Sequence, residues 1–124
     1  MSTSQIPILR LGKILLAGLL RELDDKTAVL FADELSRQVS DVGAEAVVLD
    51  ITKLEVVDSF AARILVEIAT MARLLGARVV VAGMRYSVAI TLVELGLSLP
   101  GVETALSVEH AVNMLSQPGG SRDG

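Results

Sequence analysis

Two short runs of aliphatic residues constrain the fold of this sequence more than any other feature. They are AVVL at residues 46–49 and VVVA at residues 79–82, and neither run alternates apolar with polar residues. Strands that are apolar on both faces are typical of parallel sheets covered by helices. Because parallel strands need a crossover between them, usually a helix, the two runs predict an α/β domain with a mostly parallel sheet.

Segments with apolar residues three and four positions apart flank these runs and predict helices. Four are expected: one that begins after Asp24 or Asp25 and ends at Gly43, one at residues 59–75, one at residues 86–95, and one capped by Ser107. Further strands are expected at residues 6–11 and 13–19, joined as a hairpin, and at residues 102–105. The predicted order is therefore β-β-α-β-α-β-α-β-α, with an added N-terminal strand at the edge of the sheet. We expect residues 1–117 to form one domain and the Gly-rich residues 118–124 to form a disordered C-terminal tail.

The composition disfavours several kinds of binding partner and favours self-association. A formal net charge of −4 and an aromatic content of 2% disfavour a nucleic-acid-binding surface. Cysteine is absent, which excludes disulfides and cysteine-based metal sites and fits a cytoplasmic protein. Arg10 and Lys13 interrupt the apolar N-terminal stretch, so we expect core strands there and no membrane span. The hydrophobic content of 52% indicates self-association, with the two N-terminal strands and the turn at residues 96–100 as candidate surfaces.

The segment DITKLEVVDSF at residues 50–60 is the best candidate for a functional site. It leaves a buried strand and enters a helix through Asp58 and Ser59. If Asp58 is the N-cap, Ser59 is the first helical residue and its hydroxyl faces solvent. A helix start favours a phosphate there by about 0.3–1 kcal/mol, whereas Asp58 and Glu55 oppose it. Phosphorylation should thus change the surface more than the fold, and from these residues alone an ordinary helix cap and a phosphorylation switch both stay open.

Asp50 and His110 are the remaining candidates for chemistry. Asp50 ends a predicted strand, so a receiver-like domain phosphorylated at Asp50 is an alternative. That chemistry needs further acidic residues for Mg²⁺ and a lysine after the last strand, whereas the lysines here are Lys13, Lys26 and Lys53. His110 is the only histidine and is expected at the surface. The sequence thus predicts no catalytic residue, no cofactor-binding site and no metal site.

Five short stretches, in order along the chain, resemble one known family. They are IPIL at residues 6–9, ELDD at residues 22–25 followed by Thr27, DSF at residues 58–60, TLVELG at residues 91–96 and ETAL at residues 103–106. With the order of elements, they resemble the STAS domain of bacterial anti-sigma-factor antagonists. Simpler antagonists follow the serine with a small residue, so Phe60 favours the RsbS-type scaffold subfamily of the stressosome. Sensor paralogues carry an additional N-terminal domain, and this sequence begins at its first predicted strand, which also favours the scaffold type.

The resemblance implies a role for this protein. It implies a non-enzymatic, cytoplasmic scaffold that sequesters a serine kinase of the RsbT type until Ser59 is phosphorylated. Asp58 and Phe60 would flank this phosphoacceptor and take part in recognition. The implied partners also include a sensor paralogue of the RsbR type, within a homo- or hetero-oligomer, and a serine phosphatase of the RsbX type. The alternative is a constitutive STAS interaction module without regulation at Ser59.

Overall fold

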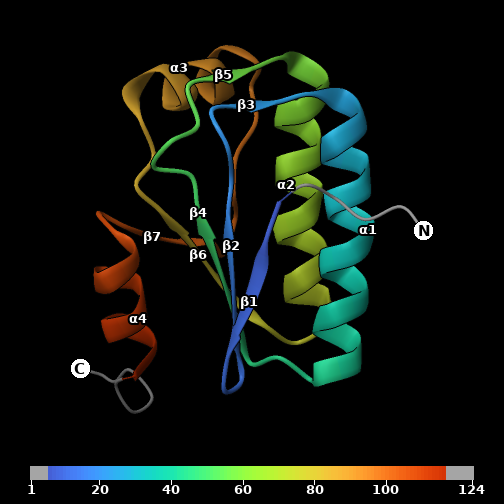
Figure 1. Ribbon diagram of the computed structural model, residues 1–124. Coiled ribbons are helices and arrows are strands. Elements are labelled where there is room, and N and C mark those ends of the chain that lie inside the picture. Colours follow the sequence, from blue (N-terminus) through green and yellow to red (C-terminus); the bar gives the residue numbers. More distant parts are fainter. Residues whose placement is uncertain (1–5, 117–124) are drawn as a thin grey trace.

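The computed structural model describes residues 6–116 and has a five-stranded sheet at its centre (Figure 1). The sheet contains β1 (Ile8–Leu11), β2 (Ile14–Gly18), β4 (Ala46–Asp50), β6 (Arg78–Ala82) and β7 (Glu103–Ala105), in the spatial order β1-β2-β4-β6-β7. The helices are α1 (Asp25–Val42), α2 (Ser59–Leu74), α3 (Tyr86–Glu94) and α4 (Val108–Ser116). β1 is antiparallel to β2, and all other neighbouring strands are parallel. The predicted α/β architecture, including the added N-terminal edge strand and the four helices, is confirmed.

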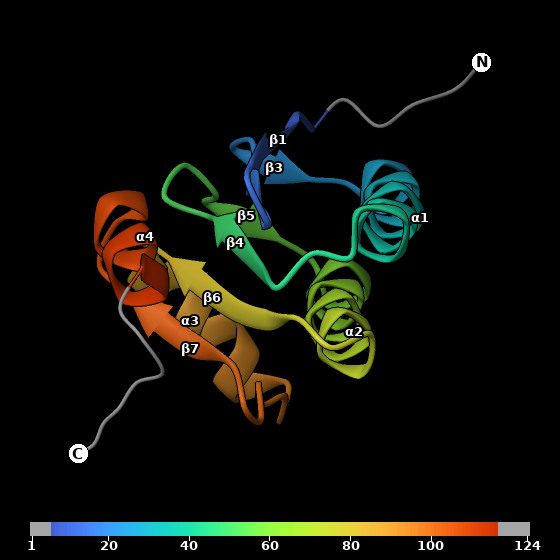
Figure 2. The ribbon, with the colours of Figure 1, turned by 90° about the horizontal axis from the view of Figure 1, so that it is seen from below.

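Helices cover both faces of the sheet. Figures 1 and 2 show α1 and α2 side by side on one face, α4 on the other face, and α3 at one end of the sheet. The larger part of the core lies under α1 and α2 and includes Phe31 and Leu65. A smaller cluster under α4 includes Val48, Val80 and Ala111. This double coverage explains why the two central strands carry aliphatic residues on both faces.

Two very short strands were not predicted from the sequence. They are β3 (Glu22–Leu23) and β5 (Val56–Val57), and they form a separate parallel pair in which Leu23 is opposite Val57. Two residues are too few to show an alternating pattern, so periodicity gives no signal for them. Their pairing is nevertheless important, because β3 leads directly into α1 and β5 leads directly into α2.

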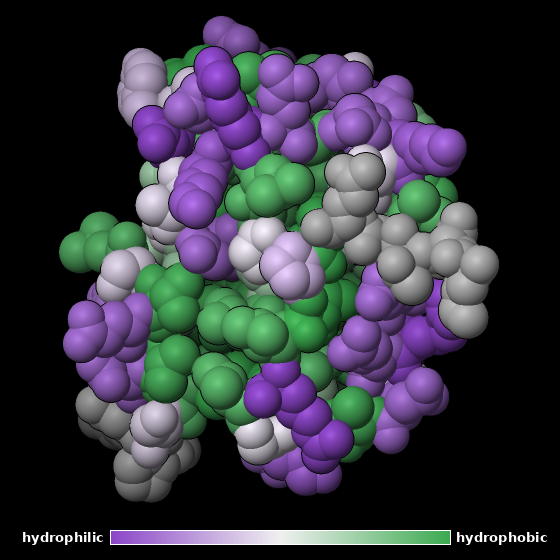
Figure 3. Space-filling model, in the orientation of Figure 1, coloured by the Kyte–Doolittle hydropathy of each residue, from purple (hydrophilic) through white to green (hydrophobic). Residues whose placement is uncertain are grey.

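Several large apolar side chains remain at the surface. Leu9 and Leu11 of β1 are 58% and 48% exposed, and Figure 3 shows an apolar area over this part of the molecule. Among residues 6–116, no helix is long and apolar enough to cross a membrane. The predicted C-terminal tail and the predicted domain boundary at residue 117 lie outside the described residues.

Candidate functional site

The starts of α1 and α2 lie next to each other at the same end of the molecule. The two helices pack against one another along their lengths (Figure 1). The pairing of Leu23 with Val57 sets their register, because each of these residues is followed at once by a helix cap. Asp24 caps α1 and Asp58 caps α2. The short strands β3 and β5 therefore bring the ELDD and DSF segments, which are far apart in the sequence, to one site.

Asp58 caps α2 in the way that its position in the sequence predicts. Its Oδ1 accepts a hydrogen bond from the backbone N–H of Ala61 at 2.8 Å, and its own backbone is extended, with φ −85° and ψ 178°. The first intrahelical bond runs from the N–H of Ala62 to the carbonyl of Asp58. Ser59 is consequently the first residue of α2.

Ser59 presents its side chain to solvent. Within the described part of the chain its hydroxyl has no hydrogen-bond partner, and the backbone N–H groups of Ser59 and Phe60 are also unpaired. The Phe60 side chain is 43% exposed beside it. An anion attached to the Ser59 oxygen would thus meet free N–H donors and the positive end of the helix dipole.

Carboxylates at the adjacent starts of α1 and α2 act in the opposite direction. Desolvation by neighbouring atoms, followed by a side-chain hydrogen bond and charge repulsion from Asp58, raises the pKa of Asp25 above its ordinary value. Asp24 behaves differently, because the backbone N–H of Thr27 donates to its carboxylate at 2.8 Å and lowers its pKa. A phosphate on Ser59 would add its charge to a site where carboxylates already repel one another.

Glu55 contributes less to this repulsion than its sequence position suggests. Its carboxylate lies 3.1 Å from Nε of Arg21 and 3.9 Å from a guanidinium nitrogen of Arg85. Arg85 is held in place by a second bond, from its Nε to the carbonyl of Thr52 at 2.9 Å. The two arginines therefore offset the negative charge of Glu55. These ion pairs were not predicted, since they join residues 30 and 34 positions apart in the sequence.

Asp50 lies at the end of β4, but its surroundings do not suit a phosphorylated aspartate. Its Oδ1 accepts from the backbone N–H of Thr52 at 3.0 Å and from the Thr52 hydroxyl at 2.6 Å, which closes a local turn. No group of three or more acidic or histidine side chains that could hold a metal ion occurs among residues 6–116. The Mg²⁺ site that receiver chemistry needs thus has no set of ligands in this part of the chain.

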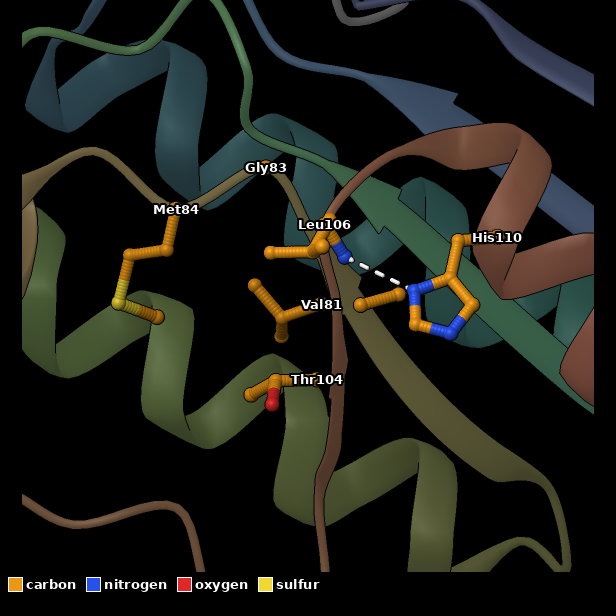
Figure 4. A pocket seen from close by; sticks show the side chains of 7 residues that line it. Val81, Gly83, Met84, Thr104, Leu106 and His110 are labelled. Carbon is orange, nitrogen blue, oxygen red and sulfur yellow. Dashed lines mark hydrogen bonds between the residues drawn. The ribbon is translucent and has the colours of Figure 1, made fainter.

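His110 is exposed, as expected, but it has a structural partner that the sequence did not indicate. Its Nδ1 accepts a hydrogen bond from the backbone N–H of Leu106 at 3.2 Å, so that the neutral ring carries its proton on Nε2. The residue lines an open cavity of about 480 Å³ next to β7 (Figure 4). Val81, Met84, Thr104 and Leu106 also line this cavity. Packing of the strand and helix ends creates it, so no local pattern could have predicted it.

Several known proteins are similar to this chain in sequence and in structure. An RsbS variant of Moorella thermoacetica, in which a serine is replaced by glutamate, is 38% identical over 90% of this chain and 95% of its own, with a TM-score of 0.81. A chain in a structure of the stressosome, described as a signal integration and transduction hub, is 37% identical over 88% of this chain and 95% of its own, with a TM-score of 0.74. The RsbT co-antagonist protein RsbRA of Bacillus subtilis is 29% identical over 112 residues, and the match spans 40% of that longer protein.

The family model of the STAS domain matches residues 6–111. This match and the similarity to RsbS confirm the predicted class, a domain without enzymatic activity of its own. The order of the main strands and helices is the predicted one, apart from the two added short strands β3 and β5. The chain belongs to the STAS domain family.

Proposed function

We propose that this protein is a cytoplasmic scaffold of a bacterial stress-signalling complex and that phosphorylation of Ser59 switches its binding to a serine kinase. The observation that carries the proposal is the exposed, unbonded hydroxyl of Ser59 at the first position of a capped helix, in a chain 38% identical to RsbS. The kinase would be of the RsbT type, and a phosphatase of the RsbX type would reset the serine. A sensor paralogue of the RsbR type would complete the assembly.

Electrostatics supports release of the kinase upon phosphorylation. The rim of the site already holds Asp24, Asp25 and Asp58. A phosphoserine carries a charge of about −1.5 to −2 near neutral pH. A partner that covers Ser59 and Phe60 must then desolvate this charge or place its own acidic groups against it. A differential affinity of about 3 kcal/mol changes the binding constant more than a hundredfold, so release needs no refolding of the domain.

Binding of the cognate kinase to three variants tests the proposal. Ser59→Ala should bind the kinase as the wild type does, whereas Ser59→Asp should bind it more weakly, measured by isothermal titration calorimetry without ATP. Ser87→Ala is the matched control. Like Ser59, Ser87 lies in the first turn of a helix, here α3, but its hydroxyl is already bonded and donates to the Glu55 carbonyl at 3.4 Å. Equal binding by Ser59→Asp and Ser59→Ala contradicts the switch and favours the constitutive interaction module.

A further inference from the structure

The outer edge of β7 carries an unpaired backbone donor and acceptor. Ala105 accepts from the N–H of Gly83 at 2.9 Å and is in register with Ala82, so the backbone groups of Ala105 point toward β6. Because these groups alternate in direction along a strand, the N–H and C=O of Thr104 point away from the sheet. Neither group has a partner within residues 6–116. β7 is therefore an open sheet edge at Thr104.

Apolar side chains border this edge on one face of the sheet. Figure 4 shows that the side chains of Val81, Thr104 and Leu106 extend to the same side, toward Met84. They surround the cavity of about 480 Å³ described above. Leu106 is 88% exposed, more than any other large hydrophobic residue in the described part of the chain. An exposed leucine thus stands beside an apolar hollow and an open strand edge.

We propose that β7 pairs with β7 of a second copy of this chain, antiparallel, about a two-fold axis at Thr104. The two Thr104 residues would exchange a pair of N–H···O bonds, which satisfies both open groups in each copy. In this register Val102 lies opposite Leu106 of the other copy, and Glu103 lies opposite Ala105. Apolar residues then face apolar residues, and no like charges lie directly opposite each other. This self-complementary pattern identifies a second copy as the occupant of the edge.

Two neighbouring interactions suit this pairing. Glu103, the charge nearest the axis, is bound by Arg78 through two hydrogen bonds of 3.0 and 2.7 Å, so the two copies would not bring bare carboxylates together. The N–H of Leu106, two residues beyond the axis, is already bound to His110, so the ladder of backbone bonds does not continue to Leu106. The pairing deepens the proposed assembly and rests on it for its role, but it uses no residue at the start of α2.

Disulfide trapping tests the pairing directly, because the chain contains no cysteine. In a hydrogen-bonded antiparallel pair the facing Cα atoms lie about 5.5 Å apart, within the range of roughly 4.4–6.8 Å that a disulfide spans. Thr104→Cys should therefore form a covalent dimer with oxidised glutathione as the oxidant, observed on a non-reducing gel. Leu9→Cys, on the exposed β1, is the control and should stay monomeric. Cross-linking of Leu9→Cys but not of Thr104→Cys overturns the proposal in favour of the β1 surface.

A second pair of variants tests the backbone bonds. Thr104→Pro removes the outward N–H without removing a bond to β6, whereas Thr104→Val keeps this N–H. By sedimentation equilibrium, the wild type and Thr104→Val should form dimers of twice the 13.1 kDa chain mass. Thr104→Pro should dimerise roughly ten- to a hundredfold more weakly. A monomeric wild type, or equal dimerisation of both variants, overturns the pairing. Kinase binding by Ser59→Ala and Ser59→Asp tests the proposed function separately, since neither substitution touches β7.

Discussion

The cap of α2 gives the prediction with the clearest magnitude. Asp58→Ala removes the acceptor of the 2.8 Å hydrogen bond from the Ala61 N–H and leaves this donor to water. Loss of a capping side chain costs about 0.5–2 kcal/mol of the free energy of unfolding. For a chain of 124 residues, a loss of about 1 kcal/mol lowers the Tm by roughly 3–5 °C.

Asp58→Asn is the matched variant, because its amide oxygen can still accept from Ala61. It loses the favourable interaction of a charge with the helix dipole, about 0.3–1 kcal/mol. It also removes the repulsion that contributes to the raised pKa of Asp25, and this gain offsets part of the loss. The Tm of Asp58→Asn should therefore stay within about 2 °C of wild type in thermal unfolding followed by circular dichroism near neutral pH. If both variants lose the same stability, the charge and not the acceptor stabilises the start of α2, and the capping argument is wrong.

Three further predictions concern stability. Gly83→Ala should cost about 2 kcal/mol or more in urea unfolding, because Gly83 has a φ of +74° and an added Cβ would overlap the Thr52 hydroxyl. The raised pKa of Asp25 means that the folded state holds this proton to higher pH than the unfolded state, so stability falls as the pH rises through that range. Asp25→Asn should thus raise the Tm at neutral pH. It should have no effect at a pH well below 3.8, the ordinary pKa of an aspartate. The hydrogen bond from Arg78 lowers the pKa of Glu103. The pair therefore stabilises the folded state at pH values above 4.5, the ordinary pKa of a glutamate, and this stabilisation is lost as the pH falls through the lowered pKa. Arg78→Gln should lower the free energy of unfolding by about 0.5 kcal/mol at neutral pH, since solvent screens this exposed pair. When unfolding is measured at successively lower pH, the difference from wild type should vanish once Glu103 is protonated.

Much of the fold was predictable because its main signals are local. The aliphatic runs of β4 and β6 are buried on both faces, which leaves an unbroken pattern in the sequence. The start of α1 was predicted after Asp24 or Asp25, and the structure shows that Asp24 is the cap. The end of α1 was predicted from Gly43, whose φ of 67° is the left-handed conformation that glycine adopts at a helix end. The same reasoning placed Asp58 as a cap and Ser59 as the first residue of α2.

The surroundings of the site could not be predicted, because they depend on contacts between distant segments. The two-residue strands β3 and β5 have no periodic pattern, yet their pairing places Asp25 beside Asp58. The ion pairs of Glu55 with Arg21 and Arg85 depend on the same packing of distant segments. The carboxylates near Ser59 were thus predicted in part, and their balance of charge came only from the three-dimensional arrangement.

The most direct test of the central claim is to locate the phosphate. The purified protein is incubated with its cognate serine kinase, ATP and Mg²⁺, and is then analysed by intact-mass and peptide-mapping mass spectrometry. The wild type and Ser87→Ala should each gain a single phosphate on Ser59, and Ser59→Ala should gain none. Phosphate on another residue, or an unmodified wild type beside an active kinase, would contradict the switch and leave Asp58 and Ser59 as an ordinary helix start.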